Sequence, residues 1–353
     1  MTRERPEVRV GTRRISATET PFLIAEIGVN HDGEVARAIE LVGAAAAAGA
    51  DAVKFQWFEA ERLVGDSGAT AAYQRRVGVS DQKAMLTSLE LGREELSLVV
   101  DAAHDHGIAA MVTVFSTELV ESARTLEWDA WKTASPDLVH RPLLEALAAD
   151  GRPLFVSTGA SDLSEVVRTD DWFPSTPLAY LHCVSAYPTP EDQADLAAMR
   201  EIVEATGRPC GYSDHTALET TGGLAVAAGA CVLEKHLTWS RAATGPDHAA
   251  SIEPEDFARY AAFVRRAHLA LGDGAKAMGE LEHDVRKVAR QSVRAACDLE
   301  AGTLVSETDL VVKRPGDGLE PWRMSEIIGR RLARGLRADE PIQERDLTAE
   351  KIP

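Results

Sequence analysis

The sequence predicts an α/β protein: a closed (β/α)8 barrel followed by a small C-terminal domain of short strands and turns. Short β-branched runs alternate with longer segments of helical spacing, and eight such strand candidates precede residue 240. These runs are too apolar to face water on either side, as is typical of parallel strands covered by helices. A chain of 353 residues has room for one large domain and a smaller one.

The strand candidates follow one another at intervals that leave space for a helix after each of them. In order, they are Phe22–Val29, Ala52–Gln56, Ala109–Phe115, Ala130–Ser135, Pro153–Thr158, Leu178–Ser185, Cys210–Ser213 and Cys231–Leu237. Helical spacing is clear in Glu34–Ala48, Arg93–His106 and Glu255–Leu271. Eight βα repeats favour a closed parallel barrel, and a doubly wound open sheet is the alternative.

Two segments depart from the repeat. The insertion from Trp57 to Leu91 is too long for an ordinary loop, which predicts that it covers a site or an interface. Past about residue 285, short apolar runs alternate with Gly/Pro turns. We therefore expect a barrel domain over 1–284 and a small domain over 285–353, joined by a charged linker at about 280–290. The small domain has a modest core and is expected to lean on a partner surface.

Composition excludes several classes of function. A net charge of −18 disfavours nucleic acid and anionic membranes as partners, because both require a basic surface. No apolar run approaches the ~18 residues of a membrane span. The four cysteines show no CxxC spacing, and three lie in apolar strand-like runs, which predicts buried, reduced thiols. With no apolar N-terminal segment, these thiols predict a cytoplasmic protein.

Polar residues stand at the end of almost every predicted strand. In a parallel barrel these ends share one bowl, where burying unpaired polar groups costs roughly 1–3 kcal/mol each. A purely structural barrel would avoid that cost, so the bowl is the predicted site. The residues concerned are Glu26, Asn30, Lys54, Gln56, Thr113, Lys132, Ser135, Ser157, Thr158, Ser185, Tyr187, Ser213, Asp214, His215, Glu234 and His236.

Two lysines of this set predict an anion site. Lys54 and Lys132 stand on well-separated strands among four hydroxyl groups, those of Thr113, Ser135, Ser157 and Ser213. Such a donor-rich wall suits a phosphate or a phosphate–carboxylate pair. Either lysine alone is better explained by an ion pair with a neighbouring carboxylate. The two together favour the anion site.

Two histidines predict a metal site. His215 and His236 end adjacent strands, and Glu234 shares the face of His236 by the two-residue period. Two imidazoles leave metal positions open for water and substrate, which is a catalytic arrangement. A lone histidine on a strand would instead be a hydrogen-bonded core residue. In the turn that follows, Asp247 could bind sugar hydroxyls, although the turn itself could be purely structural.

Six motifs in order resemble those of sialic acid synthases, the N-acetylneuraminate synthase-like family. They cover nearly the whole chain and comprise Ile24–His31, Ala50–Gln56, Leu181–Pro188, Ser213–Thr216, Glu234–His236 and Gly245–His248. The segment Val312–Gly316 resembles part of the antifreeze-like (SAF) domain, a β-clip fold that ends these enzymes.

The resemblance implies a transferase for sialic-acid-type carbohydrate biosynthesis. Its members condense phosphoenolpyruvate with an acylamino-hexose aldehyde, such as N-acetylmannosamine. The products are a nine-carbon 2-keto-3-deoxy acid and phosphate. The resemblance also implies a divalent metal, Mn²⁺ or Mg²⁺, and a domain-swapped homodimer in which the small domain of one subunit covers the barrel mouth of the other.

The resemblance also implies roles for individual residues. His215 and His236 would hold the metal that polarises the aldehyde, Glu234 would steer the water that attacks C2, and Glu26 would lie near the reacting carbons. Phosphoenolpyruvate would be held by Lys54, Thr113, Lys132, Ser135, Ser157, Ser185 and Ser213. The sugar would be held by Gln56, Asp137, Tyr187 and Asp247, with Arg314 reaching its acylamino group across the dimer.

Departures from the family pattern leave the sugar open. Where the family commonly has Ser-Gly-Glu or Ser-Gly-Asp, this chain has Ser135-Pro136-Asp137, which alters the pocket if Asp137 contacts the sugar. The absence of a second basic cluster disfavours a 6-phosphorylated sugar. The alternatives are a metal-dependent aldolase that uses pyruvate, a synthase for an unusual aldehyde, and a non-catalytic binding or assembly protein.

Overall fold

The computed structural model describes residues 7–65 and 82–351, which form two compact units. The first unit ends at Asp273 and the second begins at Gly274. The boundary expected after residue 284 therefore falls inside the second unit, within helix α12 (His283–Ala289). Each unit is described by itself below.

The first unit is a closed barrel of eight parallel strands, so the open-sheet alternative is wrong. Strand β10 pairs with β3 and closes the ring, with Val232 opposite Phe22 and His236 opposite Glu26. The strands are β3 (Phe22–Gly28), β4 (Ala52–Trp57), β5 (Ala109–Val114), β6 (Ala130–Thr133), β7 (Leu154–Ser157), β8 (Leu178–His182), β9 (Cys210–Asp214) and β10 (Val232–His236). All eight predicted strands are confirmed. However, β6 and β8 end earlier than expected, which leaves Ser135 at the start of a 3-10 helix and Ser185 in a loop.

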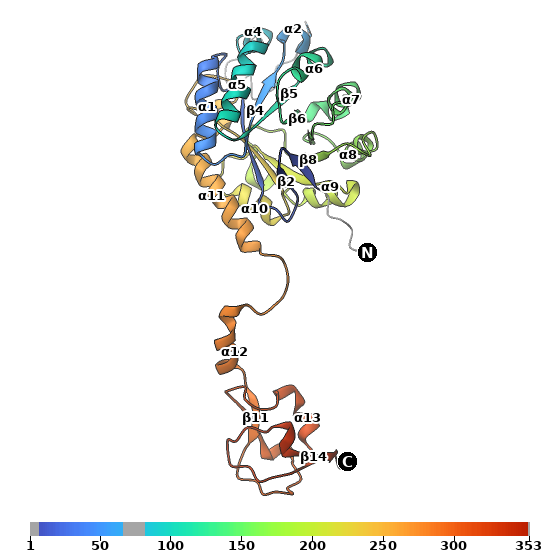
Figure 1. Ribbon diagram of the computed structural model, residues 1–353, viewed down its shortest axis with the longest axis vertical. Helices are drawn as coiled ribbons and strands as arrows, with labels where there is room; N and C mark the ends of the chain where they lie inside the picture. Colours follow the sequence, from blue (N-terminus) through green and yellow to red (C-terminus); the bar gives the residue numbers. More distant parts are fainter. Residues whose placement is uncertain (1–6, 66–81, 352–353) are drawn as a thin grey trace. The chain divides into compact units, whose positions relative to one another are not determined.

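Helices surround this barrel, as Figure 1 shows. In α5, Leu96, Val99, Val100 and Ala103 are buried, the spacing by which a helix turns one face toward a core. The surrounding helices are α1 (Val35–Ala47), α5 (Arg93–Asp105), α6 (Thr117–Arg124), α7 (Arg141–Ala148), α8 (Leu163–Asp170), α9 (Ala198–Thr206), α10 (Thr221–Ala227) and α11 (Pro254–Leu271). The predicted insertion contains α2 (Ala60–Leu63) and α4 (Gln82–Thr87), and its residues 66–81 lie outside the described part.

An N-terminal hairpin that sequence reasoning missed belongs to the barrel interior. Strands β1 (Val8–Val10) and β2 (Arg13–Ile15) pair antiparallel. Val8, Val10 and Ile15 are buried in one cluster with the first inward-facing side chains of the barrel strands, among them Phe22 and Phe155. The amino end of the barrel is therefore filled with apolar side chains, which leaves the carboxyl end for polar ones.

The second unit has a core of its own. Strands β11 (Ser292–Ala295) and β12 (Leu310–Lys313) pair antiparallel, as do β13 (Arg330–Leu332) and β14 (Leu347–Lys351), and α13 covers Met324–Ile327. The buried cluster consists of Val293, Ala295, Leu299, Val305, Leu310, Leu319, Ile327, Leu332, Leu336, Ile342 and Leu347. This small unit thus has an apolar core formed by its own side chains.

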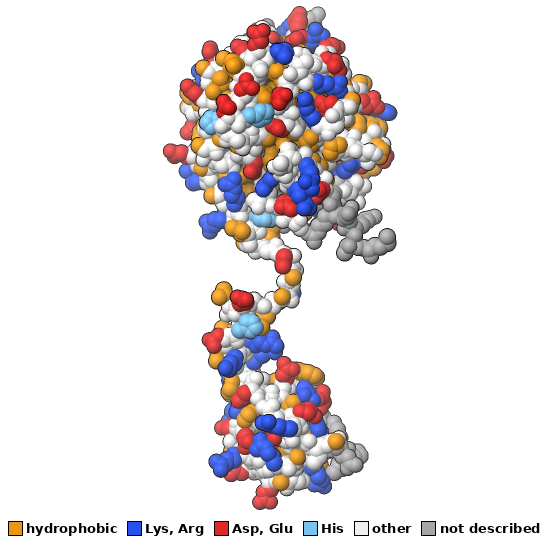
Figure 2. Space-filling model, viewed as in Figure 1, with side chains coloured by type: hydrophobic (Ala, Val, Ile, Leu, Met, Phe, Trp, Pro, Cys, Tyr) orange, Lys and Arg blue, Asp and Glu red, His pale blue; other side chains and the backbone are white. Residues whose placement is uncertain are grey.

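Charged side chains of both signs are mixed over the viewed face of each unit (Figure 2), and three of the four cysteines are buried. Among the described residues, no helix combines the length and the apolar character that crossing a bilayer requires. Cys183, Cys210 and Cys231 are buried and unpaired, as predicted, whereas Cys297 is exposed.

Candidate active site

The two-residue period of the strands builds the site. Side chains alternate between the helix-covered outer face and the barrel interior. In β3, Phe22 and Ile24 belong to the interior apolar cluster, so the next inward residue is Glu26. The same step leads from Ala52 to Lys54 in β4 and from Ala130 to Lys132 in β6. The inward side chains of Glu26, Lys54 and Lys132 thus form a polar layer next to the apolar side chains that fill the amino end of the barrel.

A cavity of about 590 Å³ opens over this polar layer. It gathers 14 of the 19 residues predicted at the strand ends or as substrate contacts. The predicted residues that line it are Glu26, Lys54, Gln56, Thr113, Lys132, Ser135, Ser157, Ser185, Tyr187, Ser213, His215, Glu234, His236 and Asp247.

The two predicted cations are paired with carboxylates. Lys54 Nζ lies 2.7 Å from Glu26 Oε2 and 3.8 Å from Glu234 Oε2, and it donates to Thr113 Oγ1 at 3.1 Å. Lys132 Nζ lies 3.7 Å from Glu234 Oε1. The lysines therefore do not form a wall of unpaired cations. Both lysines lie within 4 Å of the same carboxylate, that of Glu234.

Hydroxyl groups complete this layer. Lys132 Nζ donates to Ser157 Oγ at 2.5 Å and to the Thr133 carbonyl at 2.8 Å. Ser213 Oγ donates to Glu234 Oε1 at 2.7 Å. Each ammonium group has three N–H donors, so both lysines can add a bond to an anionic ligand or exchange an existing one for it.

The two buried glutamates differ in pKa because the charges of the lysines outweigh burial only at Glu234. Burial raises the pKa of Glu26, against the opposing charge of Lys54 and together with the charge of Glu234. Burial also opposes the ionisation of Glu234, but Lys132 and Lys54 outweigh it and hold the pKa of Glu234 at about 2. A pair of carboxyl groups with separated pKa values is typical of acid–base division of labour. Glu234 is the fixed anion, and Glu26 is the group that can exchange a proton.

Burial lowers the pKa of Lys132, whereas the pKa of Lys54 is raised. For Lys54, burial acts against the charge, but Glu26 and Glu234 together outweigh that effect. For Lys132, burial is the larger influence despite the nearby Glu234. A ligand phosphate near Lys132 would restore the balance by stabilising its charged form.

The two histidines face each other across the seam between β9 and β10. Their ring centroids are 5.6 Å apart, and Tyr187 stacks at 4.2 Å on His215. Burial lowers the pKa of both imidazoles, so they are neutral near pH 7. His215 Nδ1 is held by the Val184 carbonyl at 2.8 Å, which orients the ring.

The histidine pair fits a metal in its chemistry. Neutral imidazoles are metal ligands, and His236 Nδ1 is buried without a hydrogen-bond partner among the described residues. Within the described ranges, no group of three or more His, Cys, Asp or Glu side chains is arranged to hold a metal ion. A cation bound by these two rings would therefore depend on water or substrate for its other ligands.

Asp247 and Gln56 border the same space. Asp247 Oδ2 lies 3.7 Å from His236 Nδ1, and burial, with the charge of Glu26, raises the pKa of Asp247 to about 7. Gln56 Nε2 donates to Glu26 Oε1 at 2.8 Å. Both residues line the cavity, and the sugar contact that the family resemblance implies for them stays a prediction.

Gly159 is a site residue that sequence reasoning missed. A Cβ on it would lie 2.4 Å from Ser185 Oγ and 2.7 Å from both Cys183 Sγ and Ser135 Oγ. Its backbone N–H donates to Ser135 Oγ at 3.1 Å. The missing side chain thus makes room for polar groups from the two segments that follow β6 and β8. The sequence signal that could have identified it is a glycine directly after the strand end at Ser157 and Thr158.

An apolar side of the cavity was also missed. Val29, Phe58, Met85, Leu86 and Phe115 line it, and with Leu89 they form a separate cluster outside the barrel core. Phe58 and Phe115 contact edge to face, with centroids 6.0 Å apart. Most of these residues come from loops and from α4, where strand-end reasoning does not apply.

Five predicted site residues do not line the cavity. Three of them lie at strand ends but have other partners: Asn30 donates to the Leu237 carbonyl, Thr158 donates to the Leu181 carbonyl, and Asp214 pairs with Lys235. Asp137 sits in the 3-10 helix Ser135–Val139 and does not line the cavity, because Pro136 occupies the bordering position. The structure therefore does not support its predicted sugar contact. Arg314 lies in the second unit, exposed just after β12. Its predicted reach toward a sugar stays a prediction.

Comparison with known proteins agrees with this arrangement. Residues 41–276 match the NeuB family, and residues 290–348 match the SAF domain. The N,N'-diacetyllegionaminic acid synthase of Legionella pneumophila is 39% identical over 337 residues, which cover 93% of this chain and 95% of that protein. The synthase of the same name from Campylobacter jejuni is 33% identical, with coverage of 92% and 99%. These likenesses extend over both units.

A solved structure shows the same likeness. The crystal structure of an N-acetylneuraminic acid (sialic acid) synthetase from Leptospira borgpetersenii in complex with citrate superposes with a TM-score of 0.72 at 29% identity. The match covers 81% of this chain and 96% of that one. The fold and the order of its elements are thus shared with an enzyme of known structure.

Proposed function

Because the chain belongs to the NeuB family, whose members are phosphoenolpyruvate-dependent nonulosonic acid synthases, we propose that it condenses phosphoenolpyruvate with an acylamino-hexose aldehyde. The products are a nine-carbon 2-keto-3-deoxy acid and inorganic phosphate. The observation that carries this proposal is Glu234 between Lys54 and Lys132, with Ser157 and Ser213 beside it in one cavity. That arrangement offers charge-assisted donors to a phosphate and a fixed carboxylate to a water.

Lys54, Lys132 and the hydroxyl groups beside them would bind phosphoenolpyruvate. Lys54 and Lys132 would turn ammonium donors toward its carboxylate and phosphate. The hydroxyl groups of Ser157 and Ser213, and those of Ser135 and Ser185 beside Gly159, would donate to the remaining oxygens. Binding adds negative charge beside two glutamates, which favours protonation of the one whose pKa is already raised. That residue is Glu26.

The condensation would then proceed in two steps. The C3 carbon of the enol phosphate attacks the aldehyde carbon, which forms the new carbon–carbon bond and places negative charge on the aldehyde oxygen. Protonated Glu26, which lines the same cavity, would supply a proton to that oxygen. A water held by the Glu234 carboxylate adds to C2, and the resulting adduct loses phosphate to leave the 2-keto group.

His215 and His236 would hold a divalent cation, Mn²⁺ or Mg²⁺. When bound, the cation supplies Lewis-acid polarisation of the aldehyde, which is worth several kcal/mol of charge stabilisation. The two neutral rings and the unsatisfied Nδ1 of His236 support this assignment. Tyr187 keeps the ring of His215 in place by stacking on it.

We further propose that the acceptor is uncharged and carries apolar substituents at its far end. Among the described residues, the only Lys or Arg side chains lining the cavity are Lys54 and Lys132, and both are engaged deep in the bowl. The same cavity is also lined by the apolar cluster of Phe58, Phe115 and their neighbours. Each buried CH₂ or methyl group there contributes about 0.8 kcal/mol.

These features favour a diacylamino-6-deoxyhexose over N-acetylmannosamine, and either of them over a 6-phosphate. The names of the legionaminic acid synthases support the same order, since their products carry two N-acetyl groups. The homodimer expected from the sequence belongs to this proposal. In it, Arg314 of one subunit would act at the barrel of the other.

A substrate panel tests the proposal. The protein is incubated with phosphoenolpyruvate, Mn²⁺ and one of three acceptors: 2,4-diacetamido-2,4,6-trideoxymannose, N-acetylmannosamine or its 6-phosphate. Phosphate release and product mass are both measured. We expect kcat/KM to fall in that order. No phosphate with any acceptor, with both substrates recovered intact, would contradict the proposed function. Equal condensation with pyruvate in place of phosphoenolpyruvate would indicate an aldolase.

A further inference from the structure

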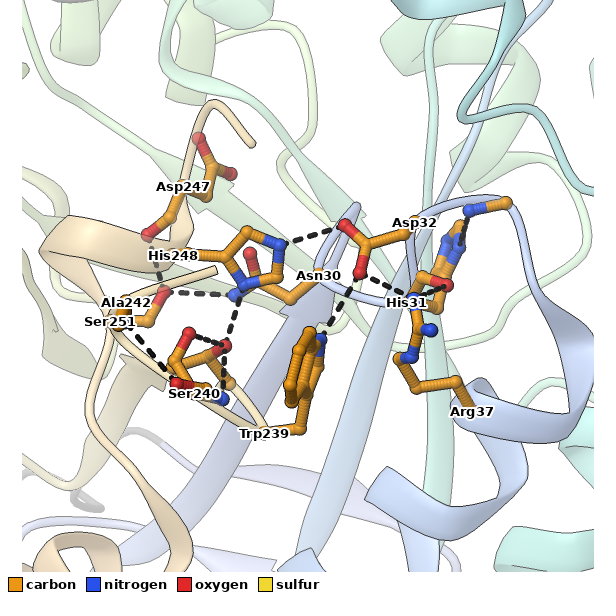
Figure 3. A network of polar contacts seen from close by, with 12 residues as sticks. Asn30, His31, Asp32, Arg37, Trp239, Ser240, Ala242, Asp247, His248 and Ser251 are labelled. Carbon is orange, nitrogen blue, oxygen red and sulfur yellow. Dashed lines mark hydrogen bonds and ion pairs between the residues drawn. The ribbon is translucent and has the colours of Figure 1, made fainter. Parts of the chain in front are cut away.

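Asp32 is the hub of a polar network beside the candidate site (Figure 3). Its Oδ1 accepts from His248 Nε2 at 2.7 Å, and its Oδ2 accepts from Arg37 Nη1 at 2.5 Å and from Trp239 Nε1 at 3.1 Å. Asp32 lies between β3 and α1, whereas His248 and Trp239 lie in the loop between β10 and α11. The network therefore joins the loops of the first and last barrel strands, 216 residues apart at Asp32 and His248.

His248 is held on both ring nitrogens and is fully buried. Its Nδ1 lies 2.6 Å from Thr238 Oγ1, which in turn donates to the Ser240 carbonyl at 3.1 Å. The order Asp32, His248, Thr238 has the pattern of a nucleophile triad. Thr238, however, has no exposed surface, so no substrate can reach its hydroxyl. The hydrogen bond between Asp32 and His248 therefore has a structural role: it holds the two loops together.

The backbone at Gly245 packs directly against the His248 ring. A Cβ on Gly245 would lie 2.6 Å from His248 Cδ2 and 2.9 Å from Nε2. Only a glycine allows the backbone before Asp247 to approach the ring so closely. Any movement of the His248 ring is therefore passed to the backbone on the N-terminal side of Asp247.

A second tie fixes the other side of Asp247. Asn30 Nδ2 donates to the Leu237 carbonyl and to Ser251 Oγ, both at 2.8 Å. Ser251 Oγ donates to the backbone carbonyl of Asp247 at 2.7 Å. In Figure 3 the Asp247 side chain points away from the His248 ring. Its carboxylate lies beside His236 in the cavity.

We propose that Asp32 and His248 are positioning residues that hold the Asp247 carboxylate at His236 and thereby set the affinity for the acceptor aldehyde. The proposal rests on the proposed function for the identity of the acceptor. The phosphoenolpyruvate side does not depend on the network, because Lys54, Lys132 and Ser157 are fixed by contacts of their own.

The test compares Asp32→Ala with Asp170→Ala in the full-length protein. Asp170 is a matched control, since it too is a partly buried hub that binds an arginine, Arg208, at 2.8 Å, and also contacts Tyr180. It lies at the end of α8, on the side where strands begin. Asp32→Asn serves as the conservative variant, because its amide oxygen still accepts from His248.

In Asp32→Ala we expect the KM for the acceptor to rise about 10-fold or more, since displacements of ~1 Å in a site can cost ~100-fold. The KM for phosphoenolpyruvate should stay within about 2-fold. Asp32→Asn should recover part of the loss. Asp170→Ala should lower the melting temperature and leave both KM values unchanged. A parallel rise in the two KM values, or the same acceptor defect in Asp170→Ala, would overturn the proposal.

Crystal structures of the two alanine variants give a readout that needs no turnover. Asp247 should leave its place beside His236 in Asp32→Ala and keep it in Asp170→Ala. An unmoved Asp247 in Asp32→Ala would overturn the positioning role. If the wild-type protein turned over no acceptor, the proposed function would fail while this structural comparison still decided the positioning role.

Discussion

Lys54 Nζ lies 2.7 Å from Glu26 Oε2, so a cation expected to bind substrate is already neutralised by a carboxylate whose own pKa is raised. Both side chains are almost fully buried. A substrate phosphate or carboxylate must therefore compete with Glu26 for Lys54. In the proposed reaction, this competition would couple substrate binding to protonation of Glu26. Glu26 would then both pair with Lys54 in the free protein and supply a proton during the reaction.

Glu26→Gln tests this coupling. The amide keeps the shape but removes the competing charge, so phosphoenolpyruvate should bind at least as tightly as in the wild type. Turnover should fall by about 10²–10⁴-fold, because a positioned general acid or base typically contributes a rate factor of that size. Calorimetry measures the first effect and phosphate release the second. Weaker binding together with retained turnover would contradict the role given to Glu26.

Glu234→Gln should destabilise the ligand-free protein. Glu234 lies within 4 Å of both Lys54 and Lys132, and removing one partner of a buried ion pair costs about 3–5 kcal/mol. Millimolar inorganic phosphate should raise the melting temperature of this variant more than that of the wild type. The control Glu145→Gln breaks an exposed pair with Arg141 and should cost at most about 1 kcal/mol. Equal phosphate responses would count against an anion site here.

His236→Ala should abolish turnover and weaken Mn²⁺ binding, because it removes one of two candidate metal ligands. His104→Ala is the control, since His104 pairs with Asp129 on the outside of the barrel. Titration of Mn²⁺ by calorimetry and turnover after exhaustive chelation are the measurements. Full activity of the chelated enzyme would exclude the metal role.

Gly159→Ala should act on the phosphoenolpyruvate side alone. The added methyl group would meet Ser185 Oγ, Cys183 Sγ and Ser135 Oγ at 2.7 Å or less, so those groups must move. We expect the KM for phosphoenolpyruvate to rise about 10-fold or more. Gly92→Ala is the control, with its nearest contact at 3.6 Å. Steady-state kinetics with each substrate varied in turn measure the two KM values separately. A rise in the KM for the acceptor would contradict the assignment of Gly159 to the phosphoenolpyruvate side.

Asp137→Asn should stabilise the fold above about pH 6. Burial raises the pKa of Asp137 to about 6, above the ordinary 3.8. An acid whose pKa is raised on folding binds its proton more tightly in the native state, so it costs stability as pH rises between these two values. The variant should match the wild type at pH 4 and exceed it at pH 8, by about 1–3 kcal/mol. Denaturation at both pH values measures this.

The same variant tests the sugar contact predicted from the sequence. Since Asp137 does not line the cavity, the KM for the acceptor should be unchanged. A several-fold rise in that KM, with no gain in stability at pH 8, would restore the sequence-based assignment.

The predictable part of the site came from local periodicity. Ile24 and Glu26, or Ala52 and Lys54, are two residues apart, so their common face follows from the geometry of a strand. The N-terminal hairpin was missed because its strands are three residues long and bring only Val8, Val10 and Ile15 to the core. So short a run, set among arginines, carries too few apolar positions to show a period.

The sequence by itself determined the barrel, its eight strands and the polar residues at their ends, because each depends on neighbours along the chain. Only the tertiary structure decided that Lys54 is paired with Glu26, that Glu234 is shared by two lysines and that Asp32 binds His248. Those contacts form where the barrel brings separate strands and loops together. The physical reason is that a two-residue period fixes which face a side chain takes, whereas the closure and packing of the barrel fix its partner.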